Sequence, residues 1–283
     1  MISGAAMIGG LVGRPIGLSL SPLIHHAWID ALGLDAAYVP FELVDDGFEP
    51  FIGGLRRTRV KGVNVTQPFK GRALAAADAA DDAARAADAA NLLLFRDDGG
   101  LEARNTDGLG LLAALRTQAP QLTLDGAHLV LIGAGGGAQG GAAALLQAGA
   151  ATLHIVNRTH ARAATMAERL SVRASAETWE RLPELLEDAD LVVNATSAGM
   201  GGAAPLDVPW PAAGRGCVAM DMVYRPLQTS FLAGAQTCGL AVVDGLEMLI
   251  GQARPTFEAL FGRPPPEGVD VRALALETME TAA

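Results

Sequence analysis

Short apolar runs alternate with amphipathic stretches of helix length along the first part of the chain. Runs rich in valine, leucine and isoleucine are typical of strands, and apolar residues spaced by three or four positions are typical of helices. The predicted elements are strands at Ile8–Val12, Ala37–Leu43 and Val60–Thr66, with helices between them at Pro22–Leu32 and Phe48–Arg57. This order predicts βαβ units and therefore a sheet whose strands are mostly parallel.

The stretch that follows is strongly biased toward alanine. Residues Ala73–Ala90 read ALAAADAADDAARAADAA, which favours one helix whose Asp and Arg side chains are solvated. The next apolar run, Asn91–Phe95, predicts another short strand. Thr106–Gln118 then predicts a connecting helix that begins close to Asp107.

The rhythm of strand and helix restarts at His128. A strand, a glycine turn and a helix of small residues are indicated by HLVLIGAGGGAQGGAAALLQAGA, and later strands by TLHIVNR, DLVVNATSAGM, CVAMDMVY and LAVVDG. Two final helices, at Leu246–Leu260 and Val269–Thr281, are expected to pack back on the first half. We therefore predict an α/β protein with two domains, one formed by residues 1–106 and completed by 245–283, the other by 107–244.

The composition supports a globular protein of this size and argues against several classes of function. The 283 residues are 50% hydrophobic, which is enough for a substantial core. A formal charge of −10 argues against a nucleic-acid partner, because such proteins need a basic surface. No apolar window is long enough for a membrane span, and the N-terminus lacks the basic residues of a signal peptide.

The cysteines and histidines predict neither disulfides nor a metal site. Cys217 and Cys238 are too few for a disulfide framework, and both are expected to be buried free thiols in a reducing cytoplasm. His25 and His26 are adjacent on a predicted helix, so they do not share a face and cannot chelate one metal ion. We therefore expect a cytoplasmic protein without a metal.

A glycine-rich turn follows the strand at His128. Gly133, Gly135 and Ala138 fit the spacing G-x-G-x-x-A, with Gly136 between them. This pattern lets backbone N–H groups approach a pyrophosphate at the N-terminus of a helix. The surrounding strand, turn and helix make the match more specific than the spacing alone, and it predicts a dinucleotide-binding domain of the Rossmann type.

The next strand ends in Asn157, Arg158 and Thr159, where the residue that reads the ribose is expected. An acidic residue there would accept from a ribose 2′-hydroxyl group. Arg158, with Arg162 one turn onward, instead suits a 2′-phosphate. Solvated arginines at a helix start are the alternative. Together with the glycine turn, the two arginines favour NADP over NAD.

Two polar strand ends are open to more than one interpretation. In Gly62–Lys70, GVNVTQPFK, a proline ends the strand near Thr66, and ligands usually bind at that edge of an α/β sheet. Lys70 is then either a reacting group or a solvated surface lysine. In Asn194–Met200, NATSAGM, Thr196 either borders the nicotinamide half of a cofactor or belongs to an ordinary turn.

Eight separated stretches together resemble the shikimate dehydrogenase family. They span Gly13 to Ala253 in the family's order: GRPIGLSLSPLIH, GVNVTQPFK, RNTDGLG, GAGGGAQG, NRT, NATSAGM, DMVYRPLQT and DGLEMLIGQA. The resemblance implies an enzyme that reduces 3-dehydroshikimate to shikimate with NADPH, in the pathway through chorismate to aromatic amino acids. It implies that the first domain binds the substrate and the second binds NADP. The residues assigned to NADP are Gly133, Gly135, Gly136, Ala138, Asn157, Arg158, Thr159, Arg162 and Thr196.

The resemblance also implies roles for residues at the positions that match. Ser19 and Ser21 would hold the substrate carboxylate, and Lys70 and Asp107 would form the catalytic pair. The side chains implied to bind the ring substituents are those of Thr66, Asn91, Tyr224 and Gln252. Helix capping is the alternative for Ser21 and Asp107, and a surface amide is the alternative for Gln252.

Several positions depart from the family's pattern. Leu18 stands where His is usual before the first serine, and Leu92 where Thr usually follows the substrate-binding Asn. The other departures are His26 for Asn, Asp88 for Gly and Gln139 for a basic residue. Because Leu18 and Leu92 border substrate residues, a paralogue acting on quinate or a related hydroxylated ring acid stays an alternative. A non-catalytic protein that senses the same ligands is another. A homodimer is one assembly that the sequence allows.

Overall fold

The chain divides into two compact units in a computed structural model that describes residues 2–281. The first unit comprises the chain up to Thr106 and again from Gln252 onward, and the second unit comprises Asp107–Gly251. The later boundary lies inside a helix, beyond residue 244 where the sequence analysis placed it. Within the described residues, no helix has both the length and the apolar character needed to cross a membrane.

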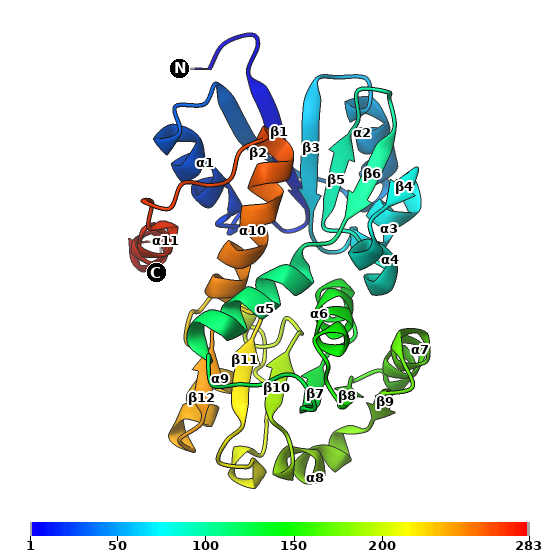
Figure 1. Ribbon diagram of the computed structural model, residues 1–283, viewed down its shortest axis with the longest axis vertical. Helices are drawn as coiled ribbons and strands as arrows, with labels where there is room; N and C mark the ends of the chain where they lie inside the picture. Colours follow the sequence, from blue (N-terminus) through cyan, green and yellow to red (C-terminus); the bar gives the residue numbers. More distant parts are fainter. Residues whose placement is uncertain (1, 282–283) are drawn as a thin grey trace. The chain divides into compact units, whose positions relative to one another are not determined.

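The first unit is built on a six-stranded mixed sheet (Figure 1). Its strands, in pairing order, are β2 (Ala36–Glu42), β1 (Met7–Gly13), β3 (Val60–Val65), β5 (Leu92–Phe95), β6 (Leu101–Arg104) and β4 (Ala79–Ala80). The first three strands are parallel, as the βαβ pattern predicted, whereas β5 is antiparallel to both of its neighbours. The carboxyl ends of β1 and β3 and the amino end of β5 therefore meet at one edge of the sheet.

Helices cover both faces of this sheet. One face is covered by α2 (Phe48–Leu55), α3 (Lys70–Ala76) and α4 (Asp82–Ala87), and the other by α1 (Ser21–Ala31) and the end of α10 (Gly245–Phe261), with α11 (Val271–Thr281) packed on α1. Trp28 of α1 and Phe257 of α10 meet edge to face, with 5.4 Å between ring centroids. A Cβ atom added to Gly62 would lie 2.8 Å from Leu260. Glycine therefore allows α10 to pack directly on β3.

The alanine-rich stretch does not form the single helix that its composition predicted. Two short helices, α3 and α4, flank β4 instead. The main-chain N–H groups of Asp78 and Asp81 donate to carbonyl groups of β6. The carboxylate of Asp81 also caps α4 by accepting from the N–H group of Ala84 at 2.6 Å. Strand pairing and an Asp cap thus outweigh the helix propensity of alanine.

The second unit has a six-stranded, fully parallel sheet. Its strands, in pairing order, are β12 (Ala241–Val243), β11 (Val218–Asp221), β10 (Leu191–Asn194), β7 (His128–Ile132), β8 (Thr152–Val156) and β9 (Ala174–Glu177). The chain runs from β7 through β8 to β9 at one edge of the sheet. It then returns to β10, beside β7, and continues through β11 to β12 at the other edge. This reversal makes the Rossmann arrangement that was predicted, and in such sheets ligands bind beside the reversal.

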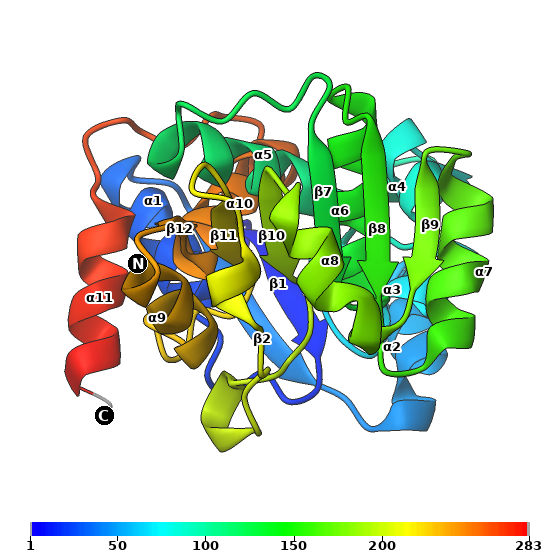
Figure 2. The ribbon, with the colours of Figure 1, turned by 90° about the horizontal axis from the view of Figure 1, so that it is seen from below.

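Alternate residues of the central strands of the second unit face two separate cores. Leu129 and Leu131 pack against α5 (Asp107–Gln118), α6 (Gly136–Gln147) and α7 (His160–Leu170). Val130 and Ile132 pack against α8 (Leu182–Glu187) and α9 (Ser230–Thr237) on the opposite face (Figure 2). A strand buried on both faces has no polar side, which explains the unbroken apolar run in the sequence.

The two cysteines lie in different environments. Both are free thiols, and Cys217 is buried directly before β11. Cys238 is exposed, because it follows the last turn of α9. The prediction that both thiols are buried is therefore wrong for Cys238.

Candidate active site

The loop between β1 and α1 carries the two serines. The N–H group of Ser19 donates to the carbonyl of Ile16 at 2.9 Å, which closes a turn. The N–H group of Ser21 then donates to the hydroxyl oxygen of Ser19 at 3.3 Å. Both serines are half-buried. Ser21 is the first residue of α1 and no side chain caps this helix, so the capping role considered for Ser21 is wrong.

Ser21 is tied to the sheet through a buried tyrosine. Its hydroxyl is hydrogen-bonded to the phenol of Tyr38, and the phenol donates to Oδ1 of Asn64 at 2.7 Å. Burial raises the pKa of Tyr38, so the phenol stays protonated and able to donate. The ring stacks on His25, with 4.0 Å between centroids, and burial lowers the pKa of His25 to about 3. A neutral aromatic stack thus fixes the group that positions Ser21.

Asn91, which directly precedes β5, is the centre of a hydrogen-bond network. Its Nδ2 donates to Oγ1 of Thr106 and to Oε1 of Gln252, each at 2.9 Å. Its Oδ1 accepts from the N–H group of Thr106 at 2.8 Å. Its main-chain carbonyl accepts from the amide of Asn64 at 3.0 Å, and that amide lies 3.4 Å from the hydroxyl of Thr256. The amide oxygen of Gln252 is thereby directed at Asn91.

Lys70 lies at the same edge of the sheet of the first unit. Thr66 follows the last residue of β3, and its N–H group donates to the carbonyl of Val12 at the end of β1 at 2.9 Å. Lys70 then begins α3 and is half-buried. Its carbonyl accepts from the N–H group of Ala90 at 2.9 Å. The main chain of Lys70 is therefore held beside the residue that precedes Asn91.

Two more of the predicted residues lie in the second unit. Asp107, only 1% exposed, is the first residue of α5 and follows Thr106 directly in the chain. Tyr224 is half-buried and lies in the loop that follows β11. Among residues 2–281, His, Cys, Asp and Glu side chains form no cluster of three or more suited to a metal ion.

A buried carboxylate organises the strand ends of the second unit. Asp221, fully buried at the end of β11, accepts from Nδ2 of Asn194 at 2.9 Å and from the hydroxyl of Thr229 at 2.6 Å. It also accepts from the N–H group of Val223 at 2.9 Å. Asn194 accepts from the hydroxyl of Thr196 at 2.7 Å. Burial raises the pKa of Asp221 even though these donors oppose the shift. One carboxylate thus fixes the loops that follow β10 and β11.

The glycine turn lies between β7 and α6. Gly133 has a φ angle of 121°, and a Cβ atom there would lie 2.9 Å from the carbonyl oxygen of Ala195. Only glycine fits this position. Gly135 precedes α6 in an extended conformation without a side-chain cap, Gly136 begins the helix, and Ala138 packs into the core. The first N–H groups of α6 are thus available to an anion, which fits the pyrophosphate of a dinucleotide.

The loop between β8 and α7 carries the two predicted arginines. Nδ2 of Asn157 donates to the carbonyl of Thr159 at 2.9 Å, which shapes the turn. Arg158 and Arg162 are exposed, and neither guanidinium group forms a hydrogen bond or an ion pair with the described residues. Two cations without carboxylate partners at this place fit the 2′-phosphate of NADP.

Sequence reasoning missed four residues that hold these groups in place: Tyr38, Thr106, Asp221 and Thr256. Asp221 had a signal, because it interrupts a buried apolar stretch, where a polar group needs a partner, whereas Thr256 lies among polar and charged residues and had none. Tyr38 and Thr106 had none. A tyrosine is common in strands, and a threonine beside Asp107 resembles an ordinary helix start.

Family comparisons agree with this arrangement of elements. Residues 11–93 match the family Shikimate dehydrogenase substrate binding domain, and residues 114–200 match the family Shikimate / quinate 5-dehydrogenase. The chain is 52% identical over 278 residues to the shikimate dehydrogenase (NADP(+)) of Caulobacter vibrioides (strain NA1000 / CB15N), with 98% of each chain covered.

The solved structures that are similar to this chain include enzymes named for different substrates. Shikimate 5-dehydrogenase from Thermus thermophilus, in complex with NADP(H) and shikimate, is 32% identical with a TM-score of 0.84, over 98% of this chain and 100% of that one. The ligand-free 5-ketofructose reductase of Gluconobacter sp. strain CHM43 is 31% identical with a TM-score of 0.85, over 99% and 100%. From these matches, the chain belongs to the shikimate dehydrogenase family.

Proposed function

We propose that this protein reduces 3-dehydroshikimate to shikimate with NADPH, reversibly, in the biosynthesis of chorismate and aromatic amino acids. The network centred on Asn91 carries the proposal, because it joins β3, β5 and α10 at the edge where the serine loop also begins. A ligand with a carboxylate and several ring hydroxyl groups suits such an edge, because hydroxyl groups can exchange hydrogen bonds with its amides and hydroxyls and because ligands of α/β sheets bind at this edge. The 52% identity to a shikimate dehydrogenase supports the same assignment.

The serine loop is the proposed binding site of the substrate carboxylate. The turn at Ile16 and the bond between the two serines bring two hydroxyl groups close together. The hydroxyl group of Ser19 offers one proton to the acid, and that of Ser21 offers its proton when it turns from the phenol of Tyr38 to the substrate. The ring hydroxyl groups are assigned to Thr66, Asn91 and Gln252 of the first unit and to Tyr224 of the second.

Lys70 and Asp107 are the proposed catalytic pair. NADPH, when bound, supplies a hydride to the carbonyl carbon, and negative charge develops on the carbonyl oxygen. The ammonium group of Lys70 stabilises this charge and transfers a proton to the oxygen, which completes the alcohol. The carboxylate of Asp107 is proposed to orient the side chain of Lys70. In the oxidation direction the neutral amine accepts the same proton.

The second unit is proposed to bind NADP, as expected for the predicted domain of residues 107–244. The glycine turn presents N–H groups to the pyrophosphate, and Arg158 and Arg162 pair with the 2′-phosphate. Asn157 and Thr159 shape the loop that carries these arginines. Thr196, held by Asn194, is assigned to the nicotinamide half of the cofactor.

We also assign the protein to the cytoplasm, where a reducing environment keeps Cys217 and Cys238 as free thiols. A homodimer is the assembly that we propose for it. Light scattering after size-exclusion chromatography measures the mass directly, and a mass close to that of one 29.1 kDa chain would exclude the dimer.

A panel of substrates and cofactors tests the activity. NADPH absorbance is followed with shikimate and quinate against NADP and NAD, and with 3-dehydroshikimate in the direction of reduction. We expect the highest kcat/KM for shikimate with NADP. Binding of shikimate without turnover would instead identify a ligand sensor, and no binding of either acid would overturn the proposal.

A second candidate function is reduction of a different polyhydroxylated ketone. Leu18, beside Ser19, is 64% exposed and stands where a His is usual in the family. An apolar side chain offers no hydrogen bond to a substrate, so substrate choice near the serine loop can differ from that of other members. The similarity to a 5-ketofructose reductase adds this sugar to the panel as the arm that tests the alternative.

A further inference from the structure

The first unit has a recess far from the polar strand ends. A cavity of about 310 Å³ opens where β3 begins. Its lining comes from the N-terminal segment, the chain before and within β3, and the turn after β5, and it includes Met7, Arg56, Arg59, Lys61, Phe95, Arg96 and Asp97. Lys61 and Thr66 are five residues apart along an extended strand, or about 17 Å. The cavity is therefore separate from the proposed substrate residues.

Basic side chains gather around this cavity although the chain as a whole is acidic. Arg56, Arg59, Lys61 and Arg96 line it, against one carboxylate, that of Asp97. The chain carries a formal charge of −10, so a recess lined mainly by cations has the opposite sign to the net charge of the chain. Such a recess concentrates anions locally, because the cations lie close together beside a wall of low dielectric.

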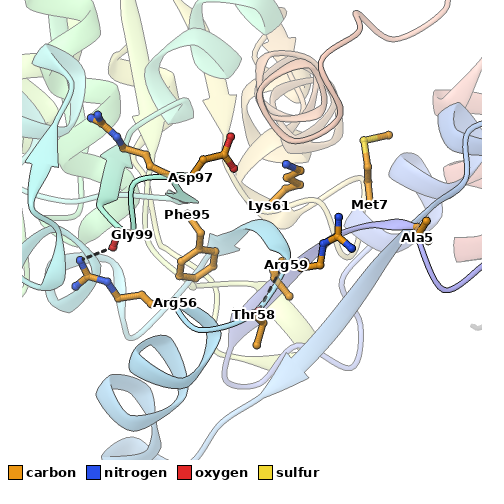
Figure 3. Close-up of a pocket in the computed structure, with 12 residues that line it drawn as sticks. Ala5, Met7, Arg56, Thr58, Arg59, Lys61, Phe95, Asp97 and Gly99 are labelled. Carbon is orange, nitrogen blue, oxygen red and sulfur yellow. Dashed lines mark hydrogen bonds between the residues drawn. The ribbon is translucent and has the colours of Figure 1, made fainter.

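Two of the four cations are already used by the fold. Arg56 pairs with Asp78 and donates to the carbonyl of Gly99 at 3.2 Å, as the dashed line in Figure 3 shows. Arg96 pairs with Asp98 at 2.7 Å. These contacts fix the turn after β5 against the start of β3, and they give the recess a defined edge.

The other two cations, Arg59 and Lys61, are exposed and form no hydrogen bond or ion pair within residues 2–281. They are two residues apart, so their Cα atoms lie at most about 7 Å from each other. In Figure 3, Lys61 lies between Asp97 and Arg59. A phosphate group, with several acceptor oxygens, can receive hydrogen bonds from both at once.

The recess also has an apolar wall. The ring of Phe95 and the side chain of Met7 line it next to the cations (Figure 3). Inorganic phosphate would leave this wall in contact with water. A volume near 310 Å³ is at the lower end of the range for small-molecule sites.

We propose that this recess binds a small organic phosphate monoester, with its phosphate on Arg59 and Lys61 and its apolar part against Phe95. The site lies at the opposite end of β3 from Thr66 and does not depend on the proposed reaction. The ligand of this site is therefore separate from the substrate of the proposed reaction.

Titration calorimetry with phenyl phosphate tests the site, with NADP and shikimate present at saturation so that their own sites are filled. We expect one binding event per chain, weakened about tenfold or more in Arg59→Ala and in Lys61→Gln, because each removes a charge-assisted hydrogen bond. Arg57→Ala is the matched control, since Arg57 carries the same charge and does not line the cavity. Thermal unfolding checks that each variant is folded.

Three comparisons decide the outcome. Equal weakening in Arg57→Ala and Arg59→Ala would overturn the proposal, because the binding would then reflect general surface charge. Inorganic phosphate that binds as tightly as phenyl phosphate would overturn the role of Phe95. No heat from phenyl phosphate at about 10 mM, a concentration chosen well above the micromolar range of specific small-molecule sites, would overturn the site itself.

Discussion

The two units hold their candidate ligand groups by different means. In the first unit the side chains bond to one another, and Asn91 alone joins Thr106 and Gln252. In the second unit the groups proposed to bind the phosphates of the cofactor are the backbone N–H groups of the glycine turn and the side chains of Arg158 and Arg162, which form no hydrogen bond or ion pair with the described residues. Substitution of one side chain in a hydrogen-bonded network also affects its partners, so the effects of two such substitutions are not additive. Substitutions of side chains that share no partner have additive effects.

The largest effect is expected at Lys70, the residue of the first unit that is proposed to transfer a proton to the substrate. Lys70→Ala should lower kcat by about 10²–10⁴-fold with little change in KM, because general acid–base catalysis contributes about that much. Stopped-flow kinetics with deuterated NADPH measure the chemical step. The double variant with Asp107→Asn should be far less than multiplicatively worse if the two residues act as a unit. Near-full kcat with a rate-limiting hydride transfer would mean that Lys70 has no role in the reaction.

Asn91→Ala breaks the network of the first unit at its centre. It leaves the N–H group of Thr106 and the amide oxygen of Gln252 without their partner, at a cost of about 1–3 kcal/mol for the buried N–H group. Urea unfolding should show this loss of stability together with a lower kcat/KM. In a double-mutant cycle with Gln252→Ala, we expect a coupling energy of about 0.5–3 kcal/mol. Strictly additive losses would mean that the network does not act as a unit.

Arg158→Ala tests the opposite behaviour in the second unit. Loss of one charge-assisted hydrogen bond should weaken NADP about ten- to a hundredfold and leave NAD unchanged. Fluorescence titration with both cofactors measures this ratio. Arg181→Ala, which removes an arginine paired with Glu184 in the same unit, is the control. Equal losses for NADP and NAD would make Arg158 a structural residue.

Ser19→Ala is expected to have a smaller effect. A carboxylate contact changes little between the ground state and the transition state, so KM for the acid should rise by about tenfold while kcat stays close to wild type. Steady-state kinetics with shikimate separate the two constants. An unchanged KM would remove Ser19 from the carboxylate site.

The smallest effect concerns pH and Asp221. Burial raises its folded pKa above the ordinary 3.8, so the folded state holds this proton more tightly than the unfolded chain. The stabilising contribution is complete below pH 3.8 and is lost as pH rises through the higher folded pKa. Relative to Asp221→Asn, which cannot ionise, the wild type should therefore lose stability across that window. Urea unfolding at a series of pH values measures the difference, and a constant difference would contradict a raised pKa.

The sequence was sufficient for elements whose apolar pattern matches their burial. The strand at His128, the glycine turn and the helix after it could be predicted, because each is a local pattern with a local cause. The break in the alanine-rich stretch could not, since it depends on pairing between β4 and the distant β6. The partners of Asn91 likewise come from positions as far away as Gln252. Residues that act through distant contacts have no local pattern to reveal them.

The passage of α10 from the second unit into the first has a consequence for synthesis on the ribosome. Gln252 and Thr256, which complete the network of the first unit, leave the ribosome only after all of Asp107–Gly251. At about 5–20 residues per second, that insertion delays them by roughly 7–30 s. During this interval the nascent first unit lacks the helix that covers β3, whereas the second unit consists of one continuous segment and is complete at its end. The unit proposed to bind the cofactor can therefore finish folding before the one proposed to bind the substrate.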